Sequence, residues 1–332
     1  MDHLVELAGE PHSFDAPAGQ SVLMAGLAAG IPLPYECSSG TCGCCKARLL
    51  EGTVRDRAPA AAGLTPRDRR RGRVLLCQCE ATSDLRLQVS PVEGLPAEPR
   101  PRDLSLCVTR LERPGPRTLR VVASAGTAVP FLPGQYVLLR IPGVGRRAYS
   151  MANPSGDEGL LELLVKAVPG GEATAYLFDR LAEGDAIEAE GPFGRAYLRE
   201  AAGGPLRCVA GGSGLAPLLS IARAALPAGA EVDFFYGART REDLVCVDEL
   251  ERLARVHGGR LRVVTCLSEP SPRDGWAGPR GNVGDVFFAQ VADLAEAPIY
   301  LAGPPPMVDA VLRGCVVERG LPADRVRFDR FF

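Results

Sequence analysis

The sequence is poor in histidine, in lysine and in long apolar runs. Its three histidines, at positions 3, 12 and 257, are too scattered to predict a metal site or a catalytic histidine. Only positions 46 and 166 are lysine, and a formal net charge of −2 excludes the broadly basic surface that binds nucleic acid. No stretch of about 18 apolar residues offers a transmembrane helix, and the start of the chain lacks the segments of a signal peptide. We therefore expect a cytoplasmic protein that binds neither nucleic acid nor a membrane.

Cysteine, in contrast, is abundant, with 11 residues in the chain. Cytoplasmic thiols stay reduced, so we do not expect a disulfide framework. Four cysteines fall within the nine residues CSSGTCGCC, which begin at Cys37, and two more follow at Cys77 and Cys79. A cluster of this kind indicates metal or redox chemistry.

The spacing of these cysteines is that of a plant-type 2Fe–2S site, C-x4-C-x2-C with a distant fourth ligand. Cys37, Cys42 and Cys45 occupy the first three positions, and the fourth is Cys77 or Cys79. The small residues between them would let backbone N–H groups approach a negatively charged cluster. A structural zinc site is the alternative, although zinc knuckles usually consist of two CxxC pairs.

The hydrophobic pattern divides the chain of 332 residues into α+β and α/β domains. Residues 1–91 mix strands with one short helix, residues 73–80 (RVLLCQCE) being one predicted strand, and residues 92–103 form a proline-rich linker. Short strand-like runs over residues 104–203 predict an antiparallel β-barrel with one helix. Strands alternate with helices over residues 204–332, which predicts a doubly wound parallel sheet.

The stretch RRAYS, in the predicted barrel, indicates a flavin site. The guanidinium of Arg147 could hold a pyrophosphate, and the ring of Tyr149 could pack on the isoalloxazine. The hydroxyl of Ser150 could bond the flavin near N5, where hydride arrives. Taken alone, the same residues would also fit an ordinary barrel strand with an exposed arginine and a packed tyrosine.

Two glycine-rich turns, each followed by a helical pattern, would present backbone N–H groups to phosphate. The first lies in VKAVPGGEAT and the second in CVAGGSGLAP, where a proline replaces the third glycine of G-x-G-x-x-G. The candidate binding residues are Lys166, Gly170, Gly171 and Thr174 in the first stretch, and Gly212, Ser213, Gly214 and Pro217 in the second.

Together these motifs resemble the reductase components of bacterial ring-hydroxylating dioxygenases and other multicomponent oxygenases. The resemblance rests on the cysteine stretches, on GQY and RAYS, and on GGSGLAP and YLAGPPPM, and it covers nearly the whole chain. It implies a β-grasp-like 2Fe–2S ferredoxin domain, an FAD-binding barrel and an NAD(P)-binding domain, in that order. It also implies that Cys77, rather than Cys79, is the fourth ligand. Cys44 falls outside the ligand spacing, and we expect it to be a bystander.

The resemblance further implies contacts to the nicotinamide. The loop AGPPPM would lie beside the nicotinamide through Gly303, Pro304 and Met307, with alanine where the family frequently has cysteine. A C-terminal aromatic would cover the flavin or nicotinamide, with Phe331 as the candidate and Phe332 as the alternative. A core aromatic on a last strand would explain the same residues.

Two arginines bear on the choice between NADH and NADPH. Arg239 and Arg241 follow the second strand of the predicted parallel sheet and could hold a 2′-phosphate, which would favour NADPH. They could equally be solvated arginines in an arginine-rich chain. The family resemblance favours NADH.

The function that the resemblance implies is electron transfer. NAD(P)H would give hydride to FAD, and single electrons would pass through the 2Fe–2S cluster to a separate protein. Tyr149, Ser150 and Phe331 would shape the reaction at the flavin, with no general acid or base. The expected acceptor is an oxygenase component, of Rieske or di-iron type, or a small ferredoxin. The alternatives are a reductase of a deoxysugar-biosynthesis dehydrase and an NADH-responsive redox sensor, although no segment remains for an output module.

Overall fold

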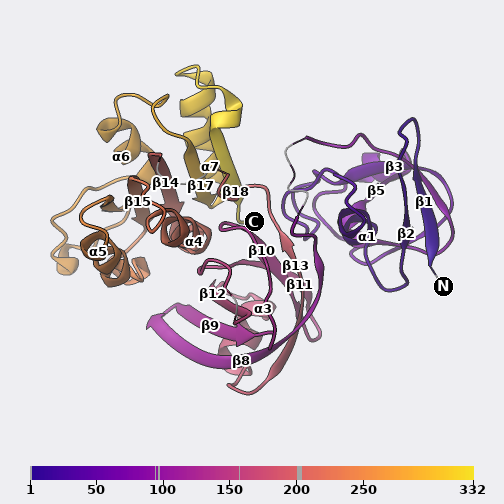
Figure 1. Ribbon diagram of the computed structural model, residues 1–332, viewed down its shortest axis with the longest axis horizontal. Coiled ribbons are helices and arrows are strands. Elements are labelled where there is room, and N and C mark those ends of the chain that lie inside the picture. The colour runs from indigo at the N-terminus through magenta and orange to yellow at the C-terminus, as the bar shows by residue number, and fades with distance from the viewer. Residues whose placement is uncertain (1, 94, 96–97, 157, 200–203) are drawn as a thin grey trace.

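The computed structural model describes residues 2–93, 95, 98–156, 158–199 and 204–332. Positions 94 and 96–97 of the predicted linker and 200–203 of the predicted barrel segment lie outside the described residues. Three sheets, one for each predicted domain, make up most of the fold (Figure 1). The domain bounds remain a prediction, and the first barrel strand already starts at Arg102, inside the predicted linker.

The N-terminal unit is a five-stranded sheet of order β2-β1-β7-β3-β5 that wraps one helix, as a β-grasp-like fold requires. The helix α1 begins after Ser21, whose hydroxyl accepts a hydrogen bond from Met24 N–H (3.2 Å). Its residues from Val22 to Leu27 are all buried against the sheet. The elements are β1 (His3–Leu7), β2 (Ser13–Ala16), α1 (Val22–Ala28), β3 (Lys46–Glu51), β4 (Val54–Asp56), α2 (Pro66–Arg70), β5 (Arg73–Leu75), β6 (Cys79–Ala81) and β7 (Leu85–Gln88).

One predicted strand of this unit is interrupted. Instead of one strand over residues 73–80, β5 ends at Leu75 and a 3₁₀ turn covers Leu76–Gln78 before β6. Leu76 is fully buried, and its N–H donates to Cys45 O (3.0 Å). The single-strand prediction was wrong because the segment changes partners: β5 pairs with β3, whereas β6 pairs with β4 in a separate two-stranded sheet. The turn directs Cys77 toward the cysteine loop.

The second unit is the predicted antiparallel barrel, with strand order β11-β10-β13-β8-β9-β12. An antiparallel bridge between Met151 and Leu163 joins the end of β11 to β12 and closes the sheet. Alternating apolar residues of the strands fill its interior. The elements are β8 (Arg102–Gly115), β9 (Thr118–Ser124), β10 (Tyr136–Ile141), β11 (Gly145–Ser150), β12 (Leu160–Lys166), α3 (Glu172–Asp179) and β13 (Ala186–Phe193).

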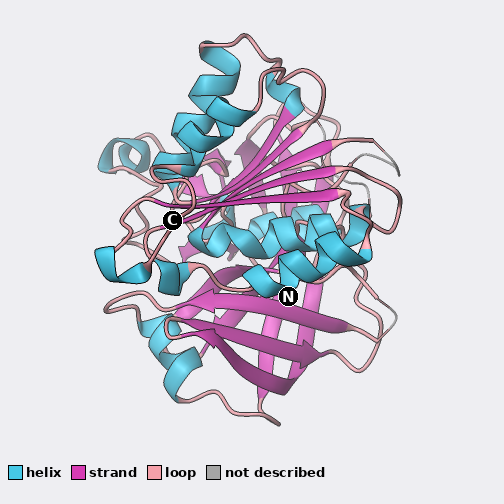
Figure 2. Cartoon of the chain, turned by 90° about the vertical axis from the view of Figure 1, so that its left-hand side faces the viewer, coloured by secondary structure: helices cyan, strands magenta, loops and turns pink. Residues whose placement is uncertain are grey.

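The C-terminal unit is the predicted doubly wound sheet, all parallel, with order β16-β15-β14-β17-β18. Helices cover both faces of the sheet (Figure 2), so its central strands, β14 and β17, are buried throughout. The elements are β14 (Leu206–Gly211), α4 (Leu215–Ala225), β15 (Val232–Ala238), α5 (Val247–Val256), β16 (Leu261–Leu267), α6 (Val283–Gln290), β17 (Ile299–Gly303), α7 (Pro305–Leu312) and β18 (Val326–Arg330). None of the helices within the described residues has the length and apolar character needed to cross a membrane.

Candidate functional site

The cysteine loop brings the predicted cluster ligands together. Cys45 Sγ lies 3.2 Å from Cys77 Sγ, and Cys42 N–H donates to Cys37 Sγ over 3.3 Å. Three of these side chains are buried and that of Cys42 is half-buried. The thiols therefore converge from one loop and from the 3₁₀ turn, as the ligands of a single cluster must.

The backbone of this loop is shaped for close approach. Gly43 has φ +76°, and a Cβ at this position would lie 2.8 Å from Gly63 O. No side chain is tolerated there, and the neighbouring N–H groups of Cys42 and Cys44 point at the sulfurs of Cys37 and Cys42 (3.3 and 3.4 Å). Donor set and backbone thus both fit a negatively charged iron–sulfur cluster.

The other cysteines near the loop have different surroundings. Cys79 is buried, and its thiol lies 3.9 Å from Leu76 O. Cys44 is exposed, and its Sγ lies 3.3 Å from a carboxylate oxygen of Glu36. Ligand atoms of Glu36, Cys42 and Cys44 lie within 4.8 Å of one another, which makes a second, more exposed group that could hold a metal ion.

The thiols perturb each other's protonation. The hydrogen bond between Cys45 and Cys77 lowers the pKa of Cys45 and raises that of Cys77. The pKa of Cys37 is also raised, first by its hydrogen bond with Cys42 and then by burial. Burial and mutual repulsion thus disfavour the joint ionisation of Cys37 and Cys77, and a bound metal would remove this penalty because thiolates are the ligating form.

A cavity of about 1090 Å³ lies where the barrel, the α/β unit and the cysteine loop meet. From the loop, Glu36, Cys37 and Ser39 line it. Most of the residues that the sequence predicted for flavin and nucleotide binding line it as well: Arg147, Tyr149, Ser150, Lys166, Gly170, Gly171, Thr174, Gly212, Ser213, Arg239, Pro304, Met307 and Phe331.

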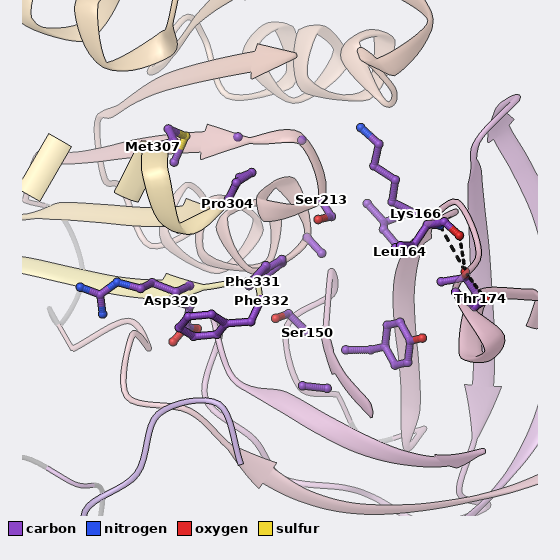
Figure 3. Close-up of a pocket in the computed structure, with 18 of the residues that line it drawn as sticks. Ser150, Leu164, Lys166, Thr174, Ser213, Pro304, Met307, Asp329, Phe331 and Phe332 are labelled. Carbon is purple, nitrogen blue, oxygen red and sulfur yellow. Dashed lines mark hydrogen bonds between the residues drawn. The ribbon is translucent and has the colours of Figure 1, made fainter. Parts of the chain in front are cut away.

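The barrel side of the cavity is built on β11 and on the turn before α3 (Figure 3). Ser150 is buried at the end of β11, and burial raises the pKa of Tyr149 to about 12, so this phenol stays neutral. Thr174 Oγ1 accepts from Val168 N–H (3.2 Å) and donates to Gly171 O (3.0 Å). Thr174 thus fixes the glycine turn rather than offering a free hydroxyl.

The α/β side presents the second glycine turn. Gly214 begins α4 against β17, and a Cβ there would lie 2.0 Å from Ala302 O, so only glycine fits. Gly214, Pro217 and Gly303 pack behind the surface and do not line the cavity. The ammonium of Lys166 lies at this turn, because a Cβ on Gly212 would be 3.7 Å from it.

The C-terminus covers the cavity between the two sides (Figure 3). Phe331 N–H donates to Gly303 O (2.9 Å), which extends the β17–β18 pairing and holds Phe331 half-buried. Phe332 also lines the cavity but is 57% exposed. Arg239 lines the far end and is exposed, whereas Arg241 is absent from the lining.

The lining residues that were not predicted from the sequence include Glu36, Tyr136 and Asp329. Tyr136 and Asp329 are buried, and burial followed by the charge of Glu36 raises the pKa of Asp329 to about 7. Arg330 Nη1 pairs with Glu36 Oε1 at 3.0 Å. The GQY motif contains Tyr136 but gave it no function. No local motif identifies Glu36 or Asp329.

Fold and site define an iron–sulfur flavoprotein reductase, and comparison with known proteins agrees. Family models match the chain as a 2Fe-2S iron-sulfur cluster binding domain (residues 5–82), an oxidoreductase FAD-binding domain (118–197) and an oxidoreductase NAD-binding domain (208–313).

Relatives match over nearly their full length. The ferredoxin–NAD(+) reductase component of the alkene monooxygenase system of Xanthobacter autotrophicus is 45% identical and covers 96% of this chain and 98% of its own. The ferredoxin–NAD(P)(+) reductase CarAd of Metapseudomonas resinovorans is 39% identical over 95% of each. The solved ferredoxin reductase in carbazole 1,9a-dioxygenase superposes with a TM-score of 0.90 at 36% identity, over 100% and 99% of the two chains.

The chain therefore belongs to the ferredoxin–NAD(P)(+) reductase components of oxygenase systems. Its cofactors are a 2Fe–2S cluster, FAD and NAD(P)H, as the sequence predicted. Electrons pass from NAD(P)H through FAD and the cluster to an oxygenase or ferredoxin partner. The comparisons support neither a deoxysugar reductase nor a redox sensor, and the matching N-terminal family binds an iron–sulfur cluster rather than zinc.

Proposed function

We propose that the chain is the reductase of a bacterial oxygenase system and that Cys37, Cys42, Cys45 and Cys77 hold its cluster. The observation that carries this proposal is the shared cavity, which is lined by Cys37 and by the predicted flavin residues. One short path then joins the group that receives hydride to the group that delivers single electrons. FAD, when bound, supplies the conversion from two-electron to one-electron chemistry.

The barrel residues would bind and orient the flavin. Arg147 lines the cavity wall and would hold the pyrophosphate, together with N–H groups of the Gly170–Gly171 turn. Tyr149 and Ser150 would contact the ring, and Lys166 would contribute positive charge beside the nucleotide turn. Phe331 would exclude water from the flavin face.

The α/β residues would place the nicotinamide nucleotide. The turn from Gly212 to Gly214 would receive the pyrophosphate at the start of α4, with Pro217 in its first turn. Gly303 gives β17 its sharp exit, after which Pro304 and Met307 would border the nicotinamide. Arg239, alone at the exposed end, would lie near the adenosine ribose, and we propose NADH as the preferred donor.

The acceptor is proposed from the relatives. The similar alkene monooxygenase and naphthalene dioxygenase reductases are named for oxygenase systems, so we infer an oxygenase component, Rieske or di-iron, or a ferredoxin serving one. A cytoplasmic location is proposed as well, because no disulfide joins any of the 11 cysteines, as in a reducing compartment. The predicted domain bounds, 1–91, 104–203 and 204–332, are retained as proposals.

The ligand assignment is tested by two neighbouring substitutions. Cys77→Ser removes a thiol that lies 3.2 Å from Cys45 Sγ, whereas Cys79→Ser removes a buried thiol that faces Leu76 O. We expect Cys77→Ser to lose most of the iron and the visible cluster absorbance, and Cys79→Ser to keep both. The reverse result would assign the fourth position to Cys79, and iron retention in both variants would refute the ligand set.

A further inference from the structure

The flavin barrel and the ferredoxin unit share a core. Tyr136 and Phe193, from β10 and β13, belong to the same buried cluster as the ferredoxin residues. Phe193 stacks on Tyr136 at 5.9 Å between ring centroids, and its other neighbour is Tyr35 at 6.1 Å, edge-on. The barrel therefore does not merely touch the ferredoxin unit but completes its packing.

Tyr136 also enters the cysteine loop itself. Its hydroxyl donates to Glu36 O (2.6 Å) and bonds Ser38 Oγ (2.9 Å), the two residues that flank Cys37. Ser38 is one of two non-glycine residues with a positive φ among those described, at +51°. This backbone conformation is costly for serine. The hydrogen bond with Tyr136 orients the Ser38 side chain and compensates for that cost.

Tyr136 lies between the flavin cavity and the cysteine loop. Tyr136 lines the cavity next to Ser150, its partner in the β10–β11 register, and is only 4% exposed. One side chain thus begins in the strand pair that carries the proposed flavin residues and ends on the backbone around the first proposed cluster ligand.

We propose that Tyr136 is a positioning residue for electron transfer between flavin and cluster: its hydroxyl fixes the loop around Cys37 against the flavin cavity. This inference rests on the proposed function. In the step concerned, one electron leaves the reduced flavin and one electron arrives at the oxidised cluster. Tyr136 keeps its proton and is neither oxidised nor reduced, so its contribution is geometric.

The test is Tyr136→Phe, which keeps the ring between Phe193 and the loop and removes only the hydroxyl. Tyr35→Phe is the matched control, because Tyr35 is equally buried at the same interface but its hydroxyl accepts from Gly194 N–H (3.0 Å) in the barrel. Both variants lose one buried interdomain hydroxyl, and only the first loses the bonds to Glu36 and Ser38.

Anaerobic stopped-flow mixing with NADH separates the two steps: flavin bleaching reports hydride transfer, and the later cluster absorbance change reports electron arrival. In Tyr136→Phe we expect cluster reduction to slow about ten-fold more than flavin bleaching. A ten-fold change in the population of the ordered loop corresponds to the loss of a hydrogen bond worth about 1.4 kcal/mol. Backbone hydrogen exchange over residues 36–45 should accelerate as well. Tyr35→Phe should leave the ratio of the two rates and this exchange close to wild type.

Two results would overturn the proposal: an unchanged ratio in Tyr136→Phe, or an equal change in both variants, which would mean general weakening of the interface. In either case the wild type would still reduce its cluster, and the proposed function would stand. A wild type whose flavin bleaches without any cluster reduction would instead contradict the proposed function itself.

Discussion

The barrel makes two interfaces of different chemistry. Toward the ferredoxin unit it presents aromatic rings, with Tyr136 and Phe193 buried against Tyr35. Toward the α/β unit it presents ion pairs: Lys166 Nζ and Arg117 Nη2 both reach Asp243, at 3.0 and 2.8 Å. The first interface is mainly aromatic, whereas the second adds ion pairs to the apolar contacts that Ala152 and Leu164 make with the α/β core.

A second group of charges extends the polar interface. Arg120 of the barrel pairs with Glu249 of α5 (2.8 Å), and Arg223 of α4 pairs with Glu162 of β12 (2.8 Å) and with Glu249. The two interfaces differ in what a substitution removes, a packed ring at the first and a counter-charge at the second. Two substitutions test these interfaces, and two more test the contacts of β18 beside the cysteine loop.

The largest effect is expected from Phe193→Ala at the aromatic interface. Loss of this buried ring should lower the free energy of unfolding by about 3–5 kcal/mol and slow cluster reduction. Phe234→Ala, in the core of the α/β unit, is the matched control, since that ring is equally buried. It should destabilise comparably without slowing cluster reduction relative to flavin bleaching. Equal slowing in both variants would show that global stability, and not this interface, controls the transfer.

Asp243→Asn tests the polar interface. Burial disfavours the charged Asp243, but its hydrogen bond and ion pair with Lys166 outweigh burial and lower its pKa. Its contribution to stability is thus present at neutral pH and is lost as pH falls through the lowered pKa. We expect a loss of about 2 kcal/mol by chemical denaturation, because Lys166 and Arg117 lose their counter-charge but remain partly exposed to water. The exposed Asp248→Asn should change stability by less than about 0.5 kcal/mol, and a similar effect of both would refute the account.

The third prediction concerns pH. The pKa of Asp329 is raised to about 7 by burial and by Glu36, so its stabilisation is complete below the ordinary carboxyl range and is lost as pH rises through about 7. Asp329→Asn should therefore gain stability over wild type as pH rises from about 5.5 to 8, by up to about 2 kcal/mol. Thermal midpoints at the two pH values check this, with the exposed Asp324→Asn as control. A pH-independent difference would contradict the assigned pKa.

The smallest effect is expected from Arg330→Gln. Arg330 bridges Glu36 (3.0 Å) and Asp309 (2.9 Å), and so ties the C-terminal strand to the cysteine loop. A half-buried pair of this kind contributes about 0.5–1 kcal/mol, less at high salt. The thermal midpoints of wild type and Arg330→Gln should differ in low salt and converge in high salt. The exposed Arg313→Gln should show no such salt dependence. A salt-independent loss would indicate a packing role instead.

The predictions made from the sequence rest on local features, and for a physical reason. Cluster spacing, glycine turns and the alternation of strands and helices are properties of short segments, and the predicted fold class is confirmed. The one strand predicted incorrectly, over residues 73–80, failed because its two halves pair with different strands, β3 and β4, and its apolar pattern does not encode that change of partner.

The contacts that join the three units could not be predicted from short segments. Tyr136 meets Glu36 across 100 positions, and Arg330 meets the same residue across 294. Contacts between residues so far apart in the sequence depend on how the three domains dock. No periodicity or motif encodes that docking. Asp329 was missed for the same reason, since its burial appears only when the last strand lies against the cysteine loop.

The most direct test of the central claim, that electrons cross both interfaces within one chain, is an anaerobic titration of the purified protein with NADH, followed by absorbance and low-temperature EPR. The account predicts that flavin absorbance bleaches and that the signal of a reduced 2Fe–2S cluster appears in the same samples. Bleaching without that signal would contradict it, because the cluster would then be missing or out of electronic contact with the flavin, and the set of four cysteines would have to be reassigned.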